Sequence, residues 1–432
     1  MRVRLAEFME LARSSFWFLP SVMMLVGVLL FSITLGLDRS DMAAPWLTRV
    51  LYSGGVENAV YLLQTLTAAM VAIATVVFST LMLVLTLATS QFGHRLIRSF
   101  MRDRANQAVL GVFLSTFVYC MLVFHMVGND PANRFVPALS VTMGFGLSLF
   151  ASCTLIYFTH HMAQLIAAPQ VLEAVAVELD DVIDRLYPES PAQRHDEGFS
   201  LRNGELVRAP RAGYVQSVGL DGVVAVAQQH DIRIESLVGY GDYVLAGAPI
   251  ARWQGSPDDQ EDGLAEKIAG EYLIGDSRMS DRDLLFAINQ VAEIAVRALS
   301  PALNNPYTAV DCINRLGASL AEVARRPVPS PLHGEDDRPR FSLQLPDFEA
   351  ALDAAFTPIR NYGRGSVLAS RQLLRTLGGL GAVATREPDR AALRRHAQVV
   401  RDAAHSALQE RHDIDDIERE FERALNGLRQ PA

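Results

Sequence analysis

The sequence predicts a membrane bundle of four helices followed by a cytoplasmic α+β region with a small β half-barrel and a helical bundle. The first observation is that four long stretches lack Asp, Glu, Lys and Arg. They lie between Arg13 and Asp38, Glu57 and Arg95, Arg104 and Asp130, and Arg134 and Glu173, and contain 24, 37, 25 and 38 residues. Because about 20 apolar residues cross a bilayer, each stretch is long enough for one span. The second observation is charge: the first 162 residues carry +3, which leaves −12 for the remaining 270.

The spans are predicted at Phe16–Leu37, Ala59–Ser90, Ala108–Val127 and Leu139–Met162. Soluble helices of this length carry charge on one face, so buried helices of a soluble protein are a poor alternative. The first apolar run is also long for the core of a cleaved signal peptide. The predicted domains are a transmembrane domain at 1–165, a connecting helix and linker at 166–200, a β-rich domain at 201–260 and a helical domain at 261–432.

Arginines near the helix ends predict the orientation. The N-terminus and the loop after the second span carry seven arginines, whereas the other two loops carry three. Positive residues favour the cytoplasmic side, and an even number of spans places both termini on one side. Lys267 is the single lysine among 39 basic residues, a bias typical of GC-rich bacterial genomes. We therefore expect a multi-pass protein of the bacterial inner membrane with both termini in the cytoplasm.

The second predicted span carries a polar stripe. A helix of this length measures about 48 Å against a hydrocarbon core of about 30 Å. Residues at steps of three, four or their sums lie on roughly one face. The stripe comprises Gln64, Ala68, Thr75, Ser79, Thr86 and Ser90. Two interpretations stay open: close helix packing through small and hydroxyl residues, or a water-facing surface in a pore built from several subunits.

Spans three and four contain residues typical of helix packing. These are Gly111, Ser115, Thr116, Gly144, Gly146 and Ser148. His125, His160 and His161 lie at span ends, with no carboxylate or cysteine near them in sequence, and we expect interfacial histidines. The three cysteines are far apart and lack zinc-site spacing, so no metal is expected.

After the spans, Val171–Leu186 predicts an amphipathic helix, and Pro188–Gly198 has the composition of a linker. Glu205–Trp253 then alternates strand-like runs with a short helix, for which Asp221 is the expected N-cap. This order resembles the half-barrel of biotinyl- and lipoyl-type domains. Those domains carry a modified lysine in a turn, but Lys267 lies beyond the unit, so no attached cofactor is expected.

The helical region opens with an expected capping box at 280–283. Farther on, Asn305 is an expected N-cap and Pro306 an expected first helical residue. A dense polar group surrounds this helix start: Asn304, Asn305, Tyr307, Thr308 and Asp311. It is either a well-capped helix junction or a site for a small ligand or ion at the helix N-terminus.

A helix is expected at Asp347–Ile359, followed by a second polar segment, Ile359–Ser366, with Arg360, Tyr362 and Arg364. Two arginines beside a tyrosine could hold an anion or phosphate, or form structural salt bridges with acidic helices. The stretch 389–428 predicts two charged helices.

The sequence offers no positive case for an enzyme. It contains no nucleophile elbow, Walker loop, HExxH motif or dinucleotide fingerprint. The net charge of −9 also argues against general nucleic-acid binding.

Two stretches have a family resemblance. One is the second span with its following loop, which includes SQFGHR, and the other is ALSPALNNPYTAVDCINRL, followed later by IRNYGRGS. With the overall layout, they resemble the bacterial membrane-protein family catalogued as domain of unknown function 2254. That family more often has Asn-Asp-Pro where this chain has Asn304-Asn305-Pro306. The resemblance implies the topology and implies no activity.

The leading functional hypothesis is a homo-oligomeric, channel-like protein whose second span lines the path and whose cytoplasmic region gates it. The alternative is a membrane-anchored sensor or scaffold that binds a small ligand or partner near Asn305–Asp311 and Arg360–Arg364. A third hypothesis, an enzyme acting on lipid or cell-wall precursors, rests only on unassigned polar residues.

Overall fold

The computed structural model describes residues 17–40, 51–92, 103–128, 136–165, 168–187, 199–255, 263–279, 281–334 and 339–429. It divides into two compact units, Met1–Gln170 and Val171–Ala432. Most of the loop arginines behind the predicted orientation, and the expected linker at 188–198, lie outside the described residues.

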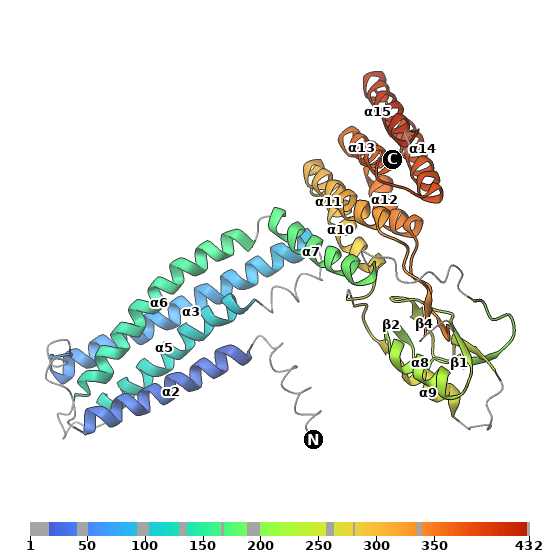
Figure 1. The fold of residues 1–432 in the computed structure, drawn as a ribbon. Helices are drawn as coiled ribbons and strands as arrows, with labels where there is room; N and C mark the ends of the chain where they lie inside the picture. The colour runs from blue at the N-terminus through green and yellow to red at the C-terminus, as the bar shows by residue number, and fades with distance from the viewer. Residues whose placement is uncertain are drawn as a thin grey trace. The chain divides into compact units, whose positions relative to one another are not determined.

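The first unit consists of long apolar helices (Figure 1). They are α2 (Phe18–Arg39), α3 (Val56–Phe92), α5 (Arg104–Gly128) and α6 (Ala138–Leu165). Among the described residues, these four helices are long and apolar enough to cross a membrane. The four predicted spans are thereby confirmed, with ends shifted by a few residues.

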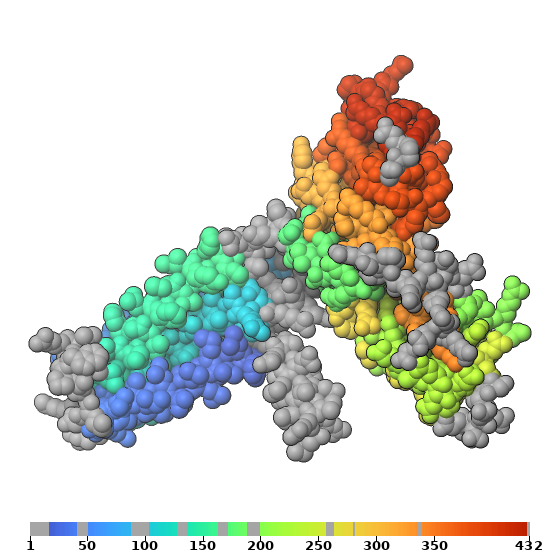
Figure 2. Space-filling view, viewed as in Figure 1, coloured from blue at the N-terminus to red at the C-terminus, as the bar shows by residue number. Residues whose placement is uncertain are grey.

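Helix α5 is the central element of this unit and packs against α2, α3 and α6. Small residues permit close approach: a Cβ added to Gly27 on α2 would lie 2.6 Å from the Ser115 hydroxyl, and one added to Gly111 would lie within 2.4 Å of Met23. The space-filling view shows the helices in contact along their lengths (Figure 2). The predicted packing role holds for Gly111 and Gly144, whereas nothing lies within 4 Å of a Cβ added to Gly146.

The second unit contains two sheets built from short strands. The strands are β1 (Glu205–Arg208), β2 (Gly213–Val218), β3 (Arg233–Ser236), β4 (Tyr243–Val244), β5 (Pro249–Gln254), β6 (Tyr272–Gly275), β7 (Leu332–His333) and β8 (Phe341–Ser342). One sheet has the order β1-β5-β3-β8-β7 and the other β4-β2-β6. Their shared core includes Ile232, Ile234, Ile250 and Phe341.

The expected half-barrel is wrong, because the strands form two open sheets. Strand β6 pairs with β2, and β8 pairs in parallel with β3, so both sheets recruit strands from outside residues 201–260. A tight turn forms at Gly241 and Asp242: Gly241 has φ +85°, and a Cβ there would lie within 1.9 Å of the Asp283 carboxylate.

Helices cover the sheets and build the rest of the unit. They are α7 (Ala168–Leu186), α8 (Leu220–Gln229), α9 (Leu264–Gly270), α10 (Leu284–Ala298), α11 (Pro306–Arg325), α12 (Phe348–Gly363), α13 (Val367–Gly381), α14 (Glu387–Ala407) and α15 (Arg411–Arg429).

Two expected caps are wrong. Asp283 caps α10 by accepting from the Phe286 N–H, instead of a box starting at residue 280, and Gly219 precedes α8 where Asp221 was expected. The side chain of Asp221 lies in the first turn of α8, where the helix dipole favours an acidic residue.

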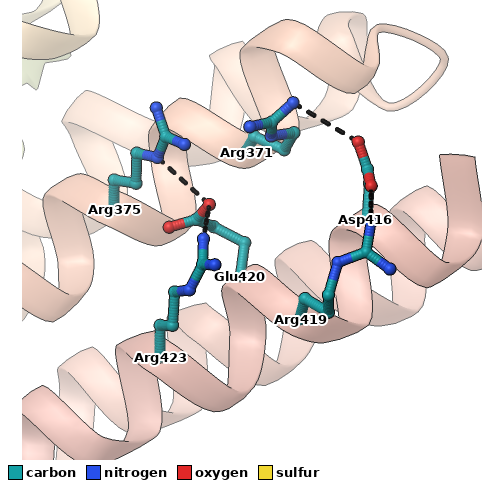
Figure 3. Close-up of polar contacts among 6 residues, drawn as sticks. All are labelled: Arg371, Arg375, Asp416, Arg419, Glu420 and Arg423. Carbon is teal, nitrogen blue, oxygen red and sulfur yellow. Dashed lines mark hydrogen bonds and ion pairs between the residues drawn. The ribbon is translucent and has the colours of Figure 1, made fainter.

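Helices α13 and α15 pack closely across small residues. A Cβ added to Gly378 would lie 2.9 Å from the Ala424 Cα atom. Ion pairs flank this contact: buried Glu420 meets Arg375 at 3.1 Å and Arg423 at 3.3 Å, and Asp416 bridges Arg371 and Arg419 (Figure 3). These charges stabilise a helix pair and leave the carboxylates satisfied.

Candidate functional site

The predicted polar stripe lies on the outward face of α3. The side chains of Gln64, Thr75, Ser79 and Thr86 are all exposed, whereas that of Ser90 lies outside the described residues. The opposite face of α3 is packed into the unit through Leu63, Met70, Val77, Leu81 and Val84. At 100° per residue, the two stripes are centred roughly 160° apart. The stripe therefore does not pack against the helices of its own subunit.

Most hydroxyls of the stripe are satisfied within the helix. Thr75 donates to the Val71 carbonyl at 2.9 Å, and Thr86 donates to the Met82 carbonyl at 2.8 Å. Gln64 differs, because its amide makes no hydrogen bond to any other residue that the structure describes. An unpaired amide in hydrocarbon costs several kcal/mol, so Gln64 needs water or a second protein surface.

A buried polar network, absent from the sequence-based expectations, joins α2, α5 and α6. The Asp38 carboxylate accepts hydrogen bonds from the N–H groups of Leu139 and Ser140 and from the Ser140 hydroxyl. Tyr119, fully buried, donates to the Ser140 carbonyl at 3.1 Å and lies 2.9 Å from the Thr34 hydroxyl. The partners are 21 to 102 positions apart, so no local spacing could reveal them.

A second polar contact lies at the other end of α5. His161 Nε2 lies 2.6 Å from Asp103 Oδ2, and the other oxygen of Asp103 accepts from the Ala105 N–H at the start of α5. Tyr157 stacks on the His161 ring. A carboxylate does therefore meet this histidine, from 58 positions away. Among the described residues, no group of three His, Cys, Asp or Glu side chains is placed to hold a metal ion.

The predicted helix start at Asn305 is confirmed. Its side-chain oxygen accepts from the Thr308 N–H at 3.3 Å, and Pro306 opens α11. Asn304 adopts a left-handed backbone with φ +43°, which lets the chain turn sharply out of α10. Tyr307 is 72% exposed. Thr308 is half-buried and Asp311 exposed, so the cap itself uses Asn305 alone.

The first part of the second predicted segment is helical, because α12 continues beyond the expected end at Ile359 to Gly363. Arg360 donates only to the neighbouring Asn361 side chain, and Arg364 forms the C-cap. Neither arginine pairs with a carboxylate in the part of the chain that the structure describes. The interpretation of this pair as structural salt bridges therefore finds no support.

The structure brings the two segments together. A Cβ added to Gly363, at the end of α12, would lie 3.1 Å from the Leu299 side chain at the end of α10. Helices α11 and α13 run in parallel beside each other, because Gln372 donates to Asn314 and Thr376 meets Gly317. The N-cap residues Asn305 and Ser366 thus lie at the same end of the helix pair.

Comparison with known proteins agrees with this architecture. The family described as Predicted membrane protein (DUF2254) matches residues 13–378. Uncharacterized proteins of Mycobacterium bovis and Mycobacterium tuberculosis are 32% identical over 342 residues, which is 77% of this chain. The match spans 65% of the length of those relatives. No solved structure matches.

Proposed function

We propose that this chain, which belongs to the family of predicted membrane proteins DUF2254, is a homo-oligomeric, channel-like protein of the bacterial inner membrane with both termini in the cytoplasm. The multi-pass membrane assignment rests on the four apolar helices and the family. The proposal adds that copies of α3 line a water-filled path and that the second unit gates it. It assigns no catalysis to the chain.

The exposed Gln64 amide carries this proposal. A polar stripe that packed helices within one subunit would face α5 or α6, but this stripe lies on the opposite side of α3. The outward faces of α2 and α6 present mainly large apolar side chains, such as Leu25 and Leu29 on α2 and Leu149 on α6. Helix α3 is therefore the better candidate for a contact with water or with a second copy. The stripe carries no charge, which favours a neutral or weakly selective path.

Ion flux into liposomes tests this function. The protein is purified, its oligomeric state is measured, and flux is compared for the parent chain, Thr75→Leu and Ser79→Leu. The matched control is Val76→Leu, which changes an exposed side chain beside the stripe. We expect both stripe variants to reduce flux at least several-fold and the control to leave it unchanged. Zero flux from a verified oligomer of the parent chain contradicts the proposal.

The second candidate is a membrane-anchored sensor or scaffold without transport. The observation that favours it is the junction of the two motif segments, where Asn305, Arg360 and Arg364 belong to one end of the second unit. A thermal-shift assay of the full chain in detergent, with inorganic phosphate as the first probe, tests it. Stabilisation that disappears in Arg364→Ala and persists in Arg202→Ala supports this candidate, and no shift with phosphate or other small anions contradicts it.

A further inference from the structure

Exposed apolar side chains of the helical region gather at one corner of the second unit. Leu303, Tyr307, Tyr362 and Leu368 are 42%, 72%, 65% and 36% exposed. Tyr362 lies in the last turn of α12, Tyr307 and Leu368 lie in the first turns of α11 and α13, and Leu303 lies between α10 and α11. The ends of α10 and α12 meet where a Cβ added to Gly363 would lie 3.1 Å from Leu299. Contiguous exposed apolar groups mark interaction sites, whereas scattered ones do not. We name these four residues the aromatic corner.

Positive charges lie next to the aromatic corner, although the second unit as a whole is acidic. Arg360 and Arg364 lie one helical turn apart and lack carboxylate partners among the described residues. The N-termini of α11 and α13 lie side by side here, and each contributes a partial positive charge. The exposed carboxylate of Asp311 follows one turn along α11, and Glu173 of α7 lies 3.9 Å from Arg315 farther along that helix. An anionic partner is therefore complementary to this corner.

The pairing of α7 with α11 shows at which end of the second unit the aromatic corner lies. Asp180 accepts from Ser319 and Arg315, both at 2.7 Å, and Asp184 accepts from Arg326 at 2.6 Å. The partners rise together in number, so the two helices are parallel and paired residues are about 140 positions apart. The part of α7 that belongs to the second unit therefore runs in the same direction as α11, and its start lies toward the N-terminal end of α11.

This register places the aromatic corner at the end of the second unit where α7 enters it. Helix α6 ends at Leu165, only three positions before α7 begins. Tyrosine and arginine are suited to the headgroup layer, where rings lie among polar groups and guanidinium groups bind phosphates. We propose that the aromatic corner docks on the anionic lipid headgroups of the bilayer that holds the spans. This inference goes beyond both proposed functions and requires neither transport nor a soluble ligand.

Quenching by labelled lipids in nanodiscs tests the docking. In a Cys153→Ser background, Leu303→Cys in the full chain receives a bimane fluorophore. The matched control is Val328→Cys, which is 63% exposed beyond the other end of α11, about 30 Å away. The discs contain phosphatidylglycerol and phosphatidylcholine, with a nitroxide on the headgroups of a fraction of the lipids. We expect quenching at 303 to exceed that at 328 by at least threefold.

Two further measurements identify the occupant. Quenching at 303 should fall at least twofold in phosphatidylcholine discs and in the variant Arg360→Gln/Arg364→Gln, since both remove charge attraction. Equal quenching at the two positions overturns the proposal. The proposal is also overturned if millimolar inorganic phosphate reduces the quenching at position 303 and lipid charge does not affect it. That result would indicate a site for a free anion. Pyrene excimers at position 303 would instead indicate a second copy of the chain and would likewise overturn it.

Discussion

The Asp38 carboxylate binds Ser140 through two hydrogen bonds: one oxygen accepts from the Ser140 hydroxyl at 2.7 Å and from the Ser140 N–H at 2.9 Å. Its other oxygen accepts the Leu139 N–H at 2.9 Å. The first N–H groups of a helix have no partner within the helix, and its N-terminus attracts negative charge. One acidic residue at the end of α2 thus satisfies the start of α6 and ties two spans together.

Replacement of Asp38 should lower the stability of the membrane unit. Asp38→Ala removes three hydrogen bonds and a capping charge, and we expect a loss of about 2–3 kcal/mol. Asp38→Asn keeps one acceptor and should lose about half as much. Thermal denaturation in detergent measures both, with the exposed Glu57→Ala as the control. Equal melting temperatures for Asp38→Ala and the control would show that the hydrogen bonds of Asp38 contribute nothing to stability.

The Tyr119 hydroxyl should be energetically coupled to Thr34. Tyr119→Phe and Thr34→Val each remove one side of their 2.9 Å contact. We expect Thr34→Val to cost about 1 kcal/mol and Tyr119→Phe about 2 kcal/mol, because Tyr119→Phe also removes the hydrogen bond to the Ser140 carbonyl. Because both lose the same bond, the double variant should be less destabilised than the sum, by about 0.6 kcal/mol. A double-mutant cycle on unfolding in micelles gives the coupling. Strict additivity would contradict a shared hydrogen bond.

Adjacent glycines of α13 should respond in opposite ways to alanine. At Gly378 a methyl group would lie 2.9 Å from the Ala424 backbone, so Gly378→Ala should force α15 away and cost about 1–3 kcal/mol. At Gly379 nothing lies within 4 Å, so Gly379→Ala should stabilise by up to about 1 kcal/mol through helix propensity. Thermal melts of the two variants distinguish the effects. A neutral Gly378→Ala would contradict the packing of α13 on α15.

His396 should make the contact between α12 and α14 sensitive to acid. Burial lowers the pKa of His396 below its ordinary 6.5, although Asp353 Oδ1 lies 2.9 Å away and opposes the shift. Arg395 and Arg360 act in the same direction as burial. Below pH 6.5, His396 is protonated in the unfolded state but stays neutral in the folded state until the pH reaches its lower folded-state pKa. This contribution to stability is complete above pH 6.5 and is lost as the pH falls through the folded-state pKa.

Hydrogen exchange of peptides from α12 and α14, corrected for intrinsic rates, measures this loss. Protection should fall by up to about 1.4 kcal/mol per pH unit below pH 6.5. His396→Gln should flatten the pH dependence, whereas His412→Gln, at an exposed position of α15, should leave it unchanged. An unchanged slope in His396→Gln would assign the acid sensitivity to other groups.

Much of the fold was predictable from local patterns. Charge-free stretches located the spans because hydrocarbon excludes ions, and Asn305 with Pro306 marked a helix start by local hydrogen bonding. The half-barrel failed because β6 and β8 join the sheets from distant positions, which no local periodicity encodes. Helix α13 was not expected: it follows directly on the glycines and arginines at the end of α12, a segment that resembles a loop in sequence.

The candidate sites were predictable as residue sets but not as surfaces. Periodicity placed Gln64, Thr75 and Ser79 on one face, but the face that α5 and α6 cover depends on tertiary packing. Likewise, the pattern could not pair Asp38 with Ser140, or Asp103 with His161, because each pair joins different helices. Side chains that act across elements require the three-dimensional arrangement.

Cysteine accessibility along α3 tests the central claim that its polar stripe faces water in the assembled protein. In the Cys153→Ser background, where Cys120 and Cys312 are buried, single cysteines replace Thr75, Ser79, Val76 and Leu87. Proteoliposomes are treated with a charged, membrane-impermeant methanethiosulfonate. The account predicts that positions 75 and 79 react and that their modification blocks flux, while positions 76 and 87 stay unmodified. Equal reactivity at all four positions, or none at 75 and 79, would contradict it.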